Sequence, residues 1–152
     1  MIRRVVSGIN VQGASCVSID GEPRKILSNN GFVLAEVWAT DSPAPDLKDK
    51  RDLTAGIEQF SMDLAPGATR FRVVEFPPGH ASMMHKTPTI DYLVVLEGEI
   101  DLAFEDGSEV HLKPGDCIIQ QGDMHAWRNR GSGRVRMAAV AVGGVGGENT
   151  LR

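Results

Sequence analysis

An all-β sandwich or barrel is the fold class that this sequence predicts, and three observations lead to it. Seventeen glycines and eight prolines divide the chain into short runs rich in Val, Ile, Leu and Phe, a pattern typical of strands joined by turns. No segment keeps the apolar period of 3.6 residues, so helix content should be low. With 152 residues and an apolar fraction of 41%, the chain can bury one core and is expected to form one domain.

The clearest hairpin signal is the stretch FEDGSEVHL. Asp106-Gly107 suits a two-residue type I′ turn, in which both central residues need a positive φ. A further turn is expected at KPGD, residues 113–116, where proline and glycine favour it. The expected strands are 3–8, 14–20, 32–40, 69–76, 91–99, 100–105, 109–113, 116–120, 125–130 and 134–142.

Two segments do not fit this strand pattern. Residues 41–61 are polar, with prolines and mixed charges, and are expected to form a surface excursion with at most a helical turn. The glycine-rich tail, residues 143–152, is expected to be mobile or to be a strand exchanged with a partner subunit.

Charge and compartment signals point to a cytoplasmic protein that binds neither nucleic acid nor membrane. The formal charge is -4, whereas nucleic acid requires a basic stripe, and the arginine cluster over 128–136 is expected to be a solvated face. No apolar run approaches the roughly 18 residues of a membrane span, and the start MIRRVVSGIN lacks the apolar stretch of a secretory signal. Cys16 and Cys117 match no metal or redox spacing, and Cys117 is expected in the core.

A spaced set of glycine, histidine and carboxylate residues surrounds the expected strand 91–99. Five residues separate Gly79 from His85, Thr87 lies two positions after His85, and six residues separate Asp91 from Gly98. This spacing resembles the first motif of the cupin superfamily throughout. Two residue types differ, since Thr87 stands in place of a second histidine and Asp91 in place of a glutamate.

The second cupin motif has a counterpart further along the chain. Gly122, His125 and Asn129 keep the spacing of its final glycine, histidine and asparagine. The interval from Gly115 to Gly122 is one residue short of the motif, and Gln120 stands in place of the proline. The chain therefore resembles small microbial cupins, and the resemblance spans about residues 67–142.

The resemblance implies a jelly-roll β-barrel, and the whole chain, 1–152, is assigned to one cupin domain. The core barrel is expected over 67–142, with N-terminal strands over 1–66 and the tail over 143–152. Cupins include dioxygenases, isomerases, decarboxylases, storage proteins and regulator domains, so the resemblance does not choose a reaction.

Strand alternation predicts which side chains enter the barrel. Asp91 should point inward with Leu93 and Val95, and His125 should share a face with Trp127. His85, Asp91 and His125 are therefore expected to meet in one lumen as catalytic residues and metal ligands. Two imidazoles and a carboxylate form the facial set that leaves coordination positions open, and N/O ligands favour Fe, Mn, Ni or Zn.

A metal-free interpretation remains beside the metal site. Asp91 is shorter than glutamate by about 1.5 Å, while metal–ligand distances tolerate only about ±0.2 Å. Asp91 and a histidine can instead form a hydrogen-bonded pair for proton transfer. His80 is a weaker ligand candidate, because on a regular strand it would face away from His85.

Four further residues are expected to contact the substrate: Gln120, Trp127, Met84 and Thr87. The leading hypothesis is a metal-dependent, dioxygenase-like enzyme for a small, partly apolar organic substrate. The alternatives are a metal-free decarboxylase or isomerase that uses the His–Asp pair, and a ligand-binding or sensor module. A homodimer is expected, because the strand MAAVAV at 137–142 is apolar on both faces, with Trp38 and Tyr92 possible at the subunit contact.

Overall fold

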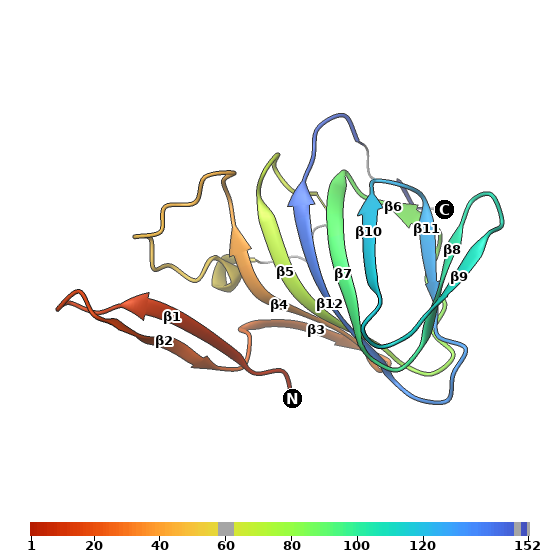
Figure 1. Cartoon of the computed structure of the whole chain (residues 1–152), viewed down its shortest axis with the longest axis horizontal. Coiled ribbons are helices and arrows are strands. Elements are labelled where there is room, and N and C mark those ends of the chain that lie inside the picture. The colour runs from red at the N-terminus through yellow and green to blue at the C-terminus, as the bar shows by residue number, and fades with distance from the viewer. Residues whose placement is uncertain (58–62, 148–149, 152) are drawn as a thin grey trace.

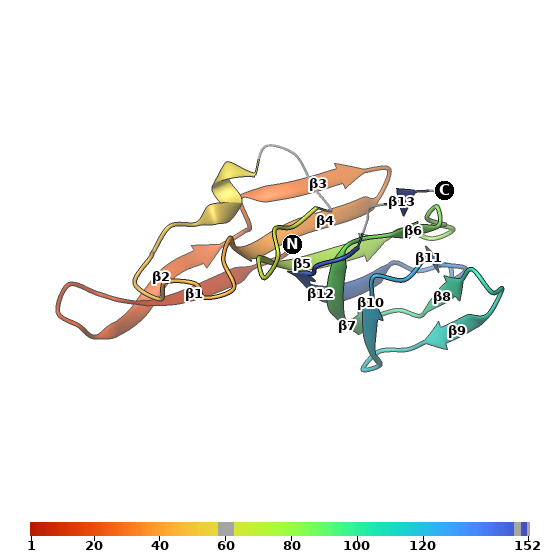
Figure 2. The same cartoon turned by 90° about the horizontal axis from the view of Figure 1, so that it is seen from above.

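Two antiparallel sheets build the barrel of this protein. The computed structural model describes residues 1–57, 63–147 and 150–151. A six-stranded and a five-stranded sheet enclose the interior, and a separate two-stranded hairpin lies beside them (Figures 1 and 2). Within the described residues, the 3₁₀ turn η1 (Leu53–Gly56) is the one helical element. The jelly-roll β-barrel expected from the sequence is thus confirmed.

The larger sheet carries most of the core-facing side chains. Its strand order is β10-β7-β12-β5-β4-β3, and every neighbouring pair is antiparallel. β12 lies between β7 and β5, so strands that are far apart in the sequence are hydrogen-bonded neighbours. The bounds are β3 Lys25–Asn29, β4 Phe32–Thr40, β5 Thr69–Phe76, β7 Thr89–Glu97, β10 Cys117–Gln121 and β12 Val135–Gly143.

The smaller sheet has the order β13-β6-β11-β8-β9. The hairpin between β8 and β9 is present as expected, but its turn is of another type. Gly107 has a φ of 85° and Asp106 does not have a positive φ, so a type I′ turn is not formed. The Asp106 carboxylate instead accepts a hydrogen bond from the Ser108 amide at 2.9 Å. The bounds are β6 His85–Lys86, β8 Ile100–Phe104, β9 Glu109–Leu112, β11 His125–Arg128 and β13 Thr150–Leu151.

The strands β3, β6 and β13 were not expected from the sequence. β6 and β13 have two residues each, too few to show a period in the sequence. Thr150 pairs with Lys86 and Leu151 with His85 in the same chain, so this part of the tail is not exchanged with a partner. The remaining tail residues 148–149 and 152, whose mobility was expected, lie outside the described residues.

The excursion after β4 contains the expected single helical turn, η1, which Asp52 caps by accepting a hydrogen bond from the Thr54 amide. Asp52 also forms a buried ion pair with Arg4 at 2.5 Å. This pair anchors the hairpin of β1 (Arg4–Ile9) and β2 (Ser15–Gly21), which extends away from the barrel (Figure 1). Residues 58–61 of the excursion lie outside the described residues.

The main core lies between the two sheets. Cys117 is not part of it: the Cys117 side chain is exposed, because in β10 the adjacent Ile118 takes the inward position. No helix within the described part of the chain has the length and apolar character that a membrane span needs. The core cluster consists of Phe76, Val95, Ile100, Leu102, Leu112, Ile118, Trp127, Val135 and Met137.

The outer face of the larger sheet carries a row of apolar side chains. Register pairs Ile119 with Tyr92, Tyr92 with Val140 and Val140 with Phe71 across four strands. Ile119 and Tyr92 are half exposed. The homodimer expected from the apolar strand 137–142 stays a prediction, and this row is where it would be tested.

Candidate functional site

Two imidazoles face one another inside the barrel. His85 on β6 and His125 on β11 are register partners, and their ring centroids lie 4.4 Å apart. His85 Nδ1 donates to the Met83 carbonyl at 3.0 Å, and His125 Nδ1 donates to the Asp123 carbonyl at 2.9 Å. These bonds place a proton on Nδ1 of both rings and leave Nε2 as the nitrogen that faces a ligand, the arrangement in which an outer hydrogen bond orients a metal-ligating histidine.

Burial affects the charge of the second imidazole. Desolvation lowers the pKa of His125 below its ordinary value, although the hydrogen bond to the Asp123 carbonyl opposes this. His125 is therefore held neutral, with its Nε2 lone pair available to a ligand.

The carboxylate of Asp91 lies on β7, on the inward face. Its Oδ1 is buried and makes no hydrogen bond within the described part of the structure. Burial raises the pKa of Asp91, and the hydrogen bond from Thr89 opposes this shift. The described residues contain no hydrogen bond between either imidazole and Asp91, and each Nδ1 donates to a backbone carbonyl.

Gln120 is the register partner of Asp91 on the neighbouring strand β10. It is 3% exposed, and its Nε2 makes no hydrogen bond to the residues that the structure describes. A buried amide without a partner is unusual. The site thus offers an unpaired donor, Gln120 Nε2, on the strand next to an unpaired acceptor, Asp91 Oδ1.

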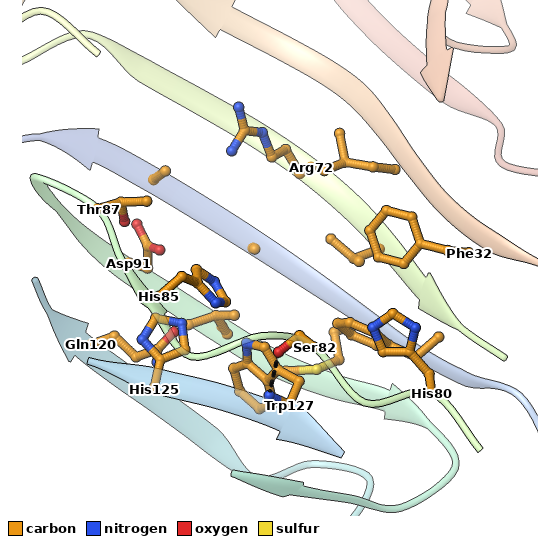
Figure 3. Close-up of a pocket in the computed structure, with 17 residues that line it drawn as sticks. Phe32, Arg72, His80, Ser82, His85, Thr87, Asp91, Gln120, His125 and Trp127 are labelled. Carbon is orange, nitrogen blue, oxygen red and sulfur yellow. Dashed lines mark hydrogen bonds between the residues drawn. The ribbon is translucent and has the colours of Figure 1, made fainter. Parts of the chain in front are cut away.

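These side chains line a cavity of about 290 Å³ inside the barrel. Figure 3 shows His85, His125, Asp91, Thr87 and Gln120 gathered at one end of it. The remaining lining residues are Phe32, Leu34, Arg72, Val74, Phe76, His80, Ser82, Leu93, Trp127, Met137, Ala139 and Ala141.

The opposite end of the cavity is aromatic. His80 stacks on Phe32 with centroids 5.5 Å apart and an interplanar angle of 18°. Phe76 lies 5.2 Å from His80 and 6.2 Å from Trp127, centroid to centroid. Trp127 in turn contacts His125 edge-on at 6.0 Å, so it connects the aromatic end with the imidazole pair.

A buried ion pair forms part of the cavity wall. Arg72 on β5 and Glu36 on β4 are register partners, and the Arg72 Nε lies 2.9 Å from Glu36 Oε1. The side chains of both residues are almost fully buried. Because the two charges compensate each other, Arg72 adds a polar surface to the cavity without an unbalanced positive charge.

The structure brings most of the residues singled out from the sequence into this cavity. His85, Asp91, His125, Thr87, Gln120 and Trp127 all line it. Met84 does not, because the His85 side chain next to it enters the cavity and successive side chains of an extended chain point to opposite sides. Met137 supplies a thioether to the wall instead.

His80 also differs from expectation. It lines the same cavity as His85, because the chain between them is irregular, with one isolated bridge at Ala81, rather than one regular strand. Its partner is the Phe32 ring and not the imidazole pair (Figure 3). Burial lowers the pKa of His80, so its ring is a neutral aromatic surface.

The three expected metal ligands share the cavity but are not a ready-made metal site. Within the described residues, no three His, Cys, Asp or Glu side chains are grouped closely enough to hold an ion. The two imidazoles are adjacent, whereas Asp91, with its short side chain, lies on another strand. The donor types nevertheless fit a divalent transition metal: two Nε2 atoms and a buried carboxylate oxygen without a partner.

Sequence reasoning missed the contribution of β4 and β5. Phe32 and Leu34 on β4 and Arg72 on β5 line the cavity. A signal existed in the run TRFRVVEF, because alternation places Arg72, Val74 and Phe76 on one face of that strand. An arginine on the apolar face of a strand indicates a buried partner.

The comparisons with known proteins agree with this architecture. Residues 72–142 match the family model of the Cupin domain. Phomopsin biosynthesis cluster protein D of Diaporthe leptostromiformis is 38% identical over 128 residues, 82% of this chain and 66% of that protein. The cupin-domain-containing oxidoreductase srdB of Neurospora crassa is 30% identical over 83% of this chain and 65% of its own length. The chain thus spans about two thirds of these relatives.

A solved structure shows the same fold. The Cnp3 cupin domain of Schizosaccharomyces pombe aligns with 94% of this chain and 88% of its own, with a TM-score of 0.57 and 15% identity. Fold, motifs and family model together define a β-barrel protein with a histidine-lined interior. This chain belongs to the cupin superfamily.

Proposed function

We propose that this cupin is a metal-dependent oxidoreductase, dioxygenase-like in type, that acts on a small, partly apolar organic molecule. The observation that carries the proposal is the pair His85–His125, with ring centroids 4.4 Å apart and both Nδ1 atoms bonded to backbone carbonyls. In metal-binding histidines the ring nitrogen that does not ligate is commonly held by a backbone carbonyl in this way. The names of several relatives as cupin-domain-containing oxidoreductases support the same class.

His85, His125 and Asp91 would hold the ion, which is Fe, Mn, Ni or Zn by the chemistry of the donors. A bound ion of this kind supplies Lewis-acid polarisation of a substrate oxygen and, where it is redox-active, O₂ activation. The unpaired Oδ1 of Asp91 is the buried polar atom that such an ion would satisfy.

The protein's own side chains supply orientation and shielding. The backbone carbonyls of Met83 and Asp123 prevent both imidazoles from rotating. Gln120 presents an amide donor to the substrate, and Trp127 with the aromatic end excludes water from one side of the cavity. Water exclusion strengthens each polar contact inside the cavity.

A metal-free decarboxylase or isomerase is the second candidate. The raised pKa of Asp91 and the lowered pKa of His125 favour it, because a protonated carboxyl and a neutral imidazole can act as acid and base. The absence of a direct hydrogen bond between Asp91 and either imidazole in the described residues counts against a preformed pair. A binding or sensor module is the third candidate, and a turnover measurement distinguishes it from both enzymes.

Elemental analysis of protein purified without added metal is the first test. We expect close to one Fe, Mn, Ni or Zn ion per chain, and its loss in the His125→Ala variant. His111→Ala is the matched control, because His111 lies on the surface with Glu99 and Asp101. Retention of the ion by His125→Ala, or no ion at any loading, would overturn the proposed metal site.

Oxygen uptake by the metal-loaded protein is the second test. A panel of small aromatic and aliphatic carbonyl compounds is supplied, and consumption of O₂ together with substrate is expected for at least one. Turnover of a substrate by the metal-depleted protein, with no uptake of O₂, would favour the acid–base enzyme instead. Binding without any turnover would favour the sensor module.

A further inference from the structure

The two ends of the cavity differ in chemistry, and this difference suggests which substrates fit the proposed function. The imidazole pair, Asp91 and Gln120 form one end, and stacked aromatic rings form the other (Figure 3). The volume of about 290 Å³ is at the small end of the usual range for ligand pockets. One ring with a short side chain is therefore a better match than a fused ring system.

The aromatic end is built for a flat surface. Phe32 and His80 are nearly parallel, with an interplanar angle of 18°, while Phe76 is inclined at 62° to Phe32 and at 52° to His80. Rings that stack or meet edge to face in this way are stabilised by more free energy than the burial of their apolar surface alone provides. A planar π system would add to this group more favourably than a saturated ring of the same size.

Gln120 identifies the polar group of the ligand. Its side chain is 3% exposed, lines the cavity and has an Nε2 without a partner in the described residues. Buried donors in folded proteins are almost always satisfied. A ligand oxygen that accepts a hydrogen bond at this position would complete the arrangement.

The charges of the wall argue against an anionic ligand. The positive charge of Arg72 is compensated by Glu36, at 2.9 Å. Burial lowers the pKa of His80, which lies on the Phe32 ring, so the aromatic end supplies no cation near neutral pH. Asp91 places a carboxyl group beside Gln120, and a carboxylate ligand there would be buried next to it while the Arg72 charge is already paired with Glu36.

We propose that the cavity selects a neutral aromatic ketone or aldehyde, with the ring at the Phe32–His80 end and the carbonyl oxygen accepting a hydrogen bond from Gln120. This inference rests on the proposed function, which it deepens by naming the substrate class. It makes Gln120 a residue that positions the reacting group next to His85 and His125, and Phe32 and His80 residues that determine specificity.

The test uses four probes of similar size on metal-depleted protein: acetophenone, cyclohexyl methyl ketone, ethylbenzene and benzoate. Affinities are measured by isothermal titration calorimetry, and the side-chain amide of Gln120 is followed by ¹H–¹⁵N NMR. Acetophenone is expected to bind about threefold to tenfold more tightly than each of the others. The Gln120 amide resonances should move with both ketones and much less with ethylbenzene.

Variants separate the two contributions. Gln120→Leu should remove the preference for acetophenone over ethylbenzene, and His80→Leu the preference over the cyclohexyl ketone. Gln121→Leu is the matched control, because Gln121 is the exposed neighbour on β10 and is not among the cavity-lining residues. Unfolding midpoints close to the wild-type value confirm that each variant is folded.

Several results would overturn the proposal. They are equal affinity for both ketones, unchanged selectivity in Gln120→Leu, and tighter binding of benzoate. Failure here is distinguishable from failure of the proposed function, since binding is measured without metal or turnover. Metal binding and O₂ uptake without selectivity for acetophenone would indicate an oxidoreductase for another substrate class. Selectivity for acetophenone without metal binding or O₂ uptake would indicate an aromatic-ketone site without the metal reaction.

Discussion

The Arg72 guanidinium lies 2.9 Å from the Glu36 carboxylate in the wall of the cavity, and both side chains are almost completely buried. The pair joins β4 to β5, so a strand outside the family-matched segment 72–142 contributes directly to the cavity of the barrel. Burying two charges is unfavourable unless they remain together. The pair therefore links the stability of the sheet to the polarity of the site.

Removing one partner of this ion pair should destabilise the folded protein. Glu36→Met leaves the Arg72 charge buried, and we expect the free energy of unfolding to fall by about 3–5 kcal/mol. The double variant Glu36→Met/Arg72→Met should recover most of that loss, because it buries no charge. Urea unfolding of the three proteins measures both effects, and a double variant as unstable as the single one would refute this explanation.

Asn129 should matter for stability rather than for chemistry. Its Nδ2 donates to the carbonyls of Phe76, Pro77 and Gly133 at 2.9–3.2 Å, and the residue is 1% exposed. Asn129→Ala removes these hydrogen bonds and the one that Asn129 Oδ1 accepts from the Gly131 amide, and we expect a loss of about 3 kcal/mol in urea unfolding. Asn10→Ala, at an exposed turn, is the control and should cost less than about 1 kcal/mol; equal losses would contradict the argument.

The two motif glycines should respond differently to alanine. Gly98 has a φ of 78°, and a Cβ there would lie 2.7 Å from the Arg134 carbonyl oxygen. Gly79 has a φ of 73°, with no atom within 4 Å of an added Cβ. Gly79→Ala should therefore lower the free energy of unfolding only by the strain of a left-handed alanine, about 1–2 kcal/mol. Gly98→Ala should lower it by clearly more. Thermal unfolding measures both, and equal midpoints would show that the strand pair adapts.

His111 should give the protein a pH-dependent increment of stability. Its hydrogen bonds to Asp101 and Glu99 raise the pKa of His111 above the ordinary 6.5. Because the folded-state pKa is the higher one, the increment is complete below the unfolded pKa and is lost as pH rises through the folded pKa. His111→Gln should thus lower the unfolding midpoint at about pH 5.5 and have little effect at about pH 8.5. A difference that is the same at both pH values would exclude this origin.

The expected homodimer can be tested at the outer face of the larger sheet. Tyr92 and Ile119 are paired there and are 50% and 54% exposed. If two chains associate through this face, Tyr92→Glu or Ile119→Glu should shift the mass measured by light scattering from dimer to monomer. Val110→Glu, at an exposed position of β9, is the control. A wild-type protein that is monomeric by light scattering would contradict the expected homodimer.

Strand alternation and motif spacing were sufficient for much of the fold and of the cavity. They identified the inward positions of Asp91, His125 and Trp127, because the side-chain period of a strand is two residues. They failed for His80, which lies in an irregular segment where no strand period applies, and Met84, selected as the neighbour of His85, is not among the cavity-lining residues. They also failed for Cys117, since in a short apolar run the two faces of a strand have the same composition.

Turn residues, alternation and motif spacing are local properties of the chain, so the all-β class and the residue types of the site could be predicted from the amino-acid sequence. Three contacts could be seen only in the folded chain: Gln120 beside Asp91, Phe32 stacked on His80, and Glu36 paired with Arg72. These contacts depend on strand order and register. Both result from packing the whole barrel, because a shift of one residue along a strand would move every side chain to its other face.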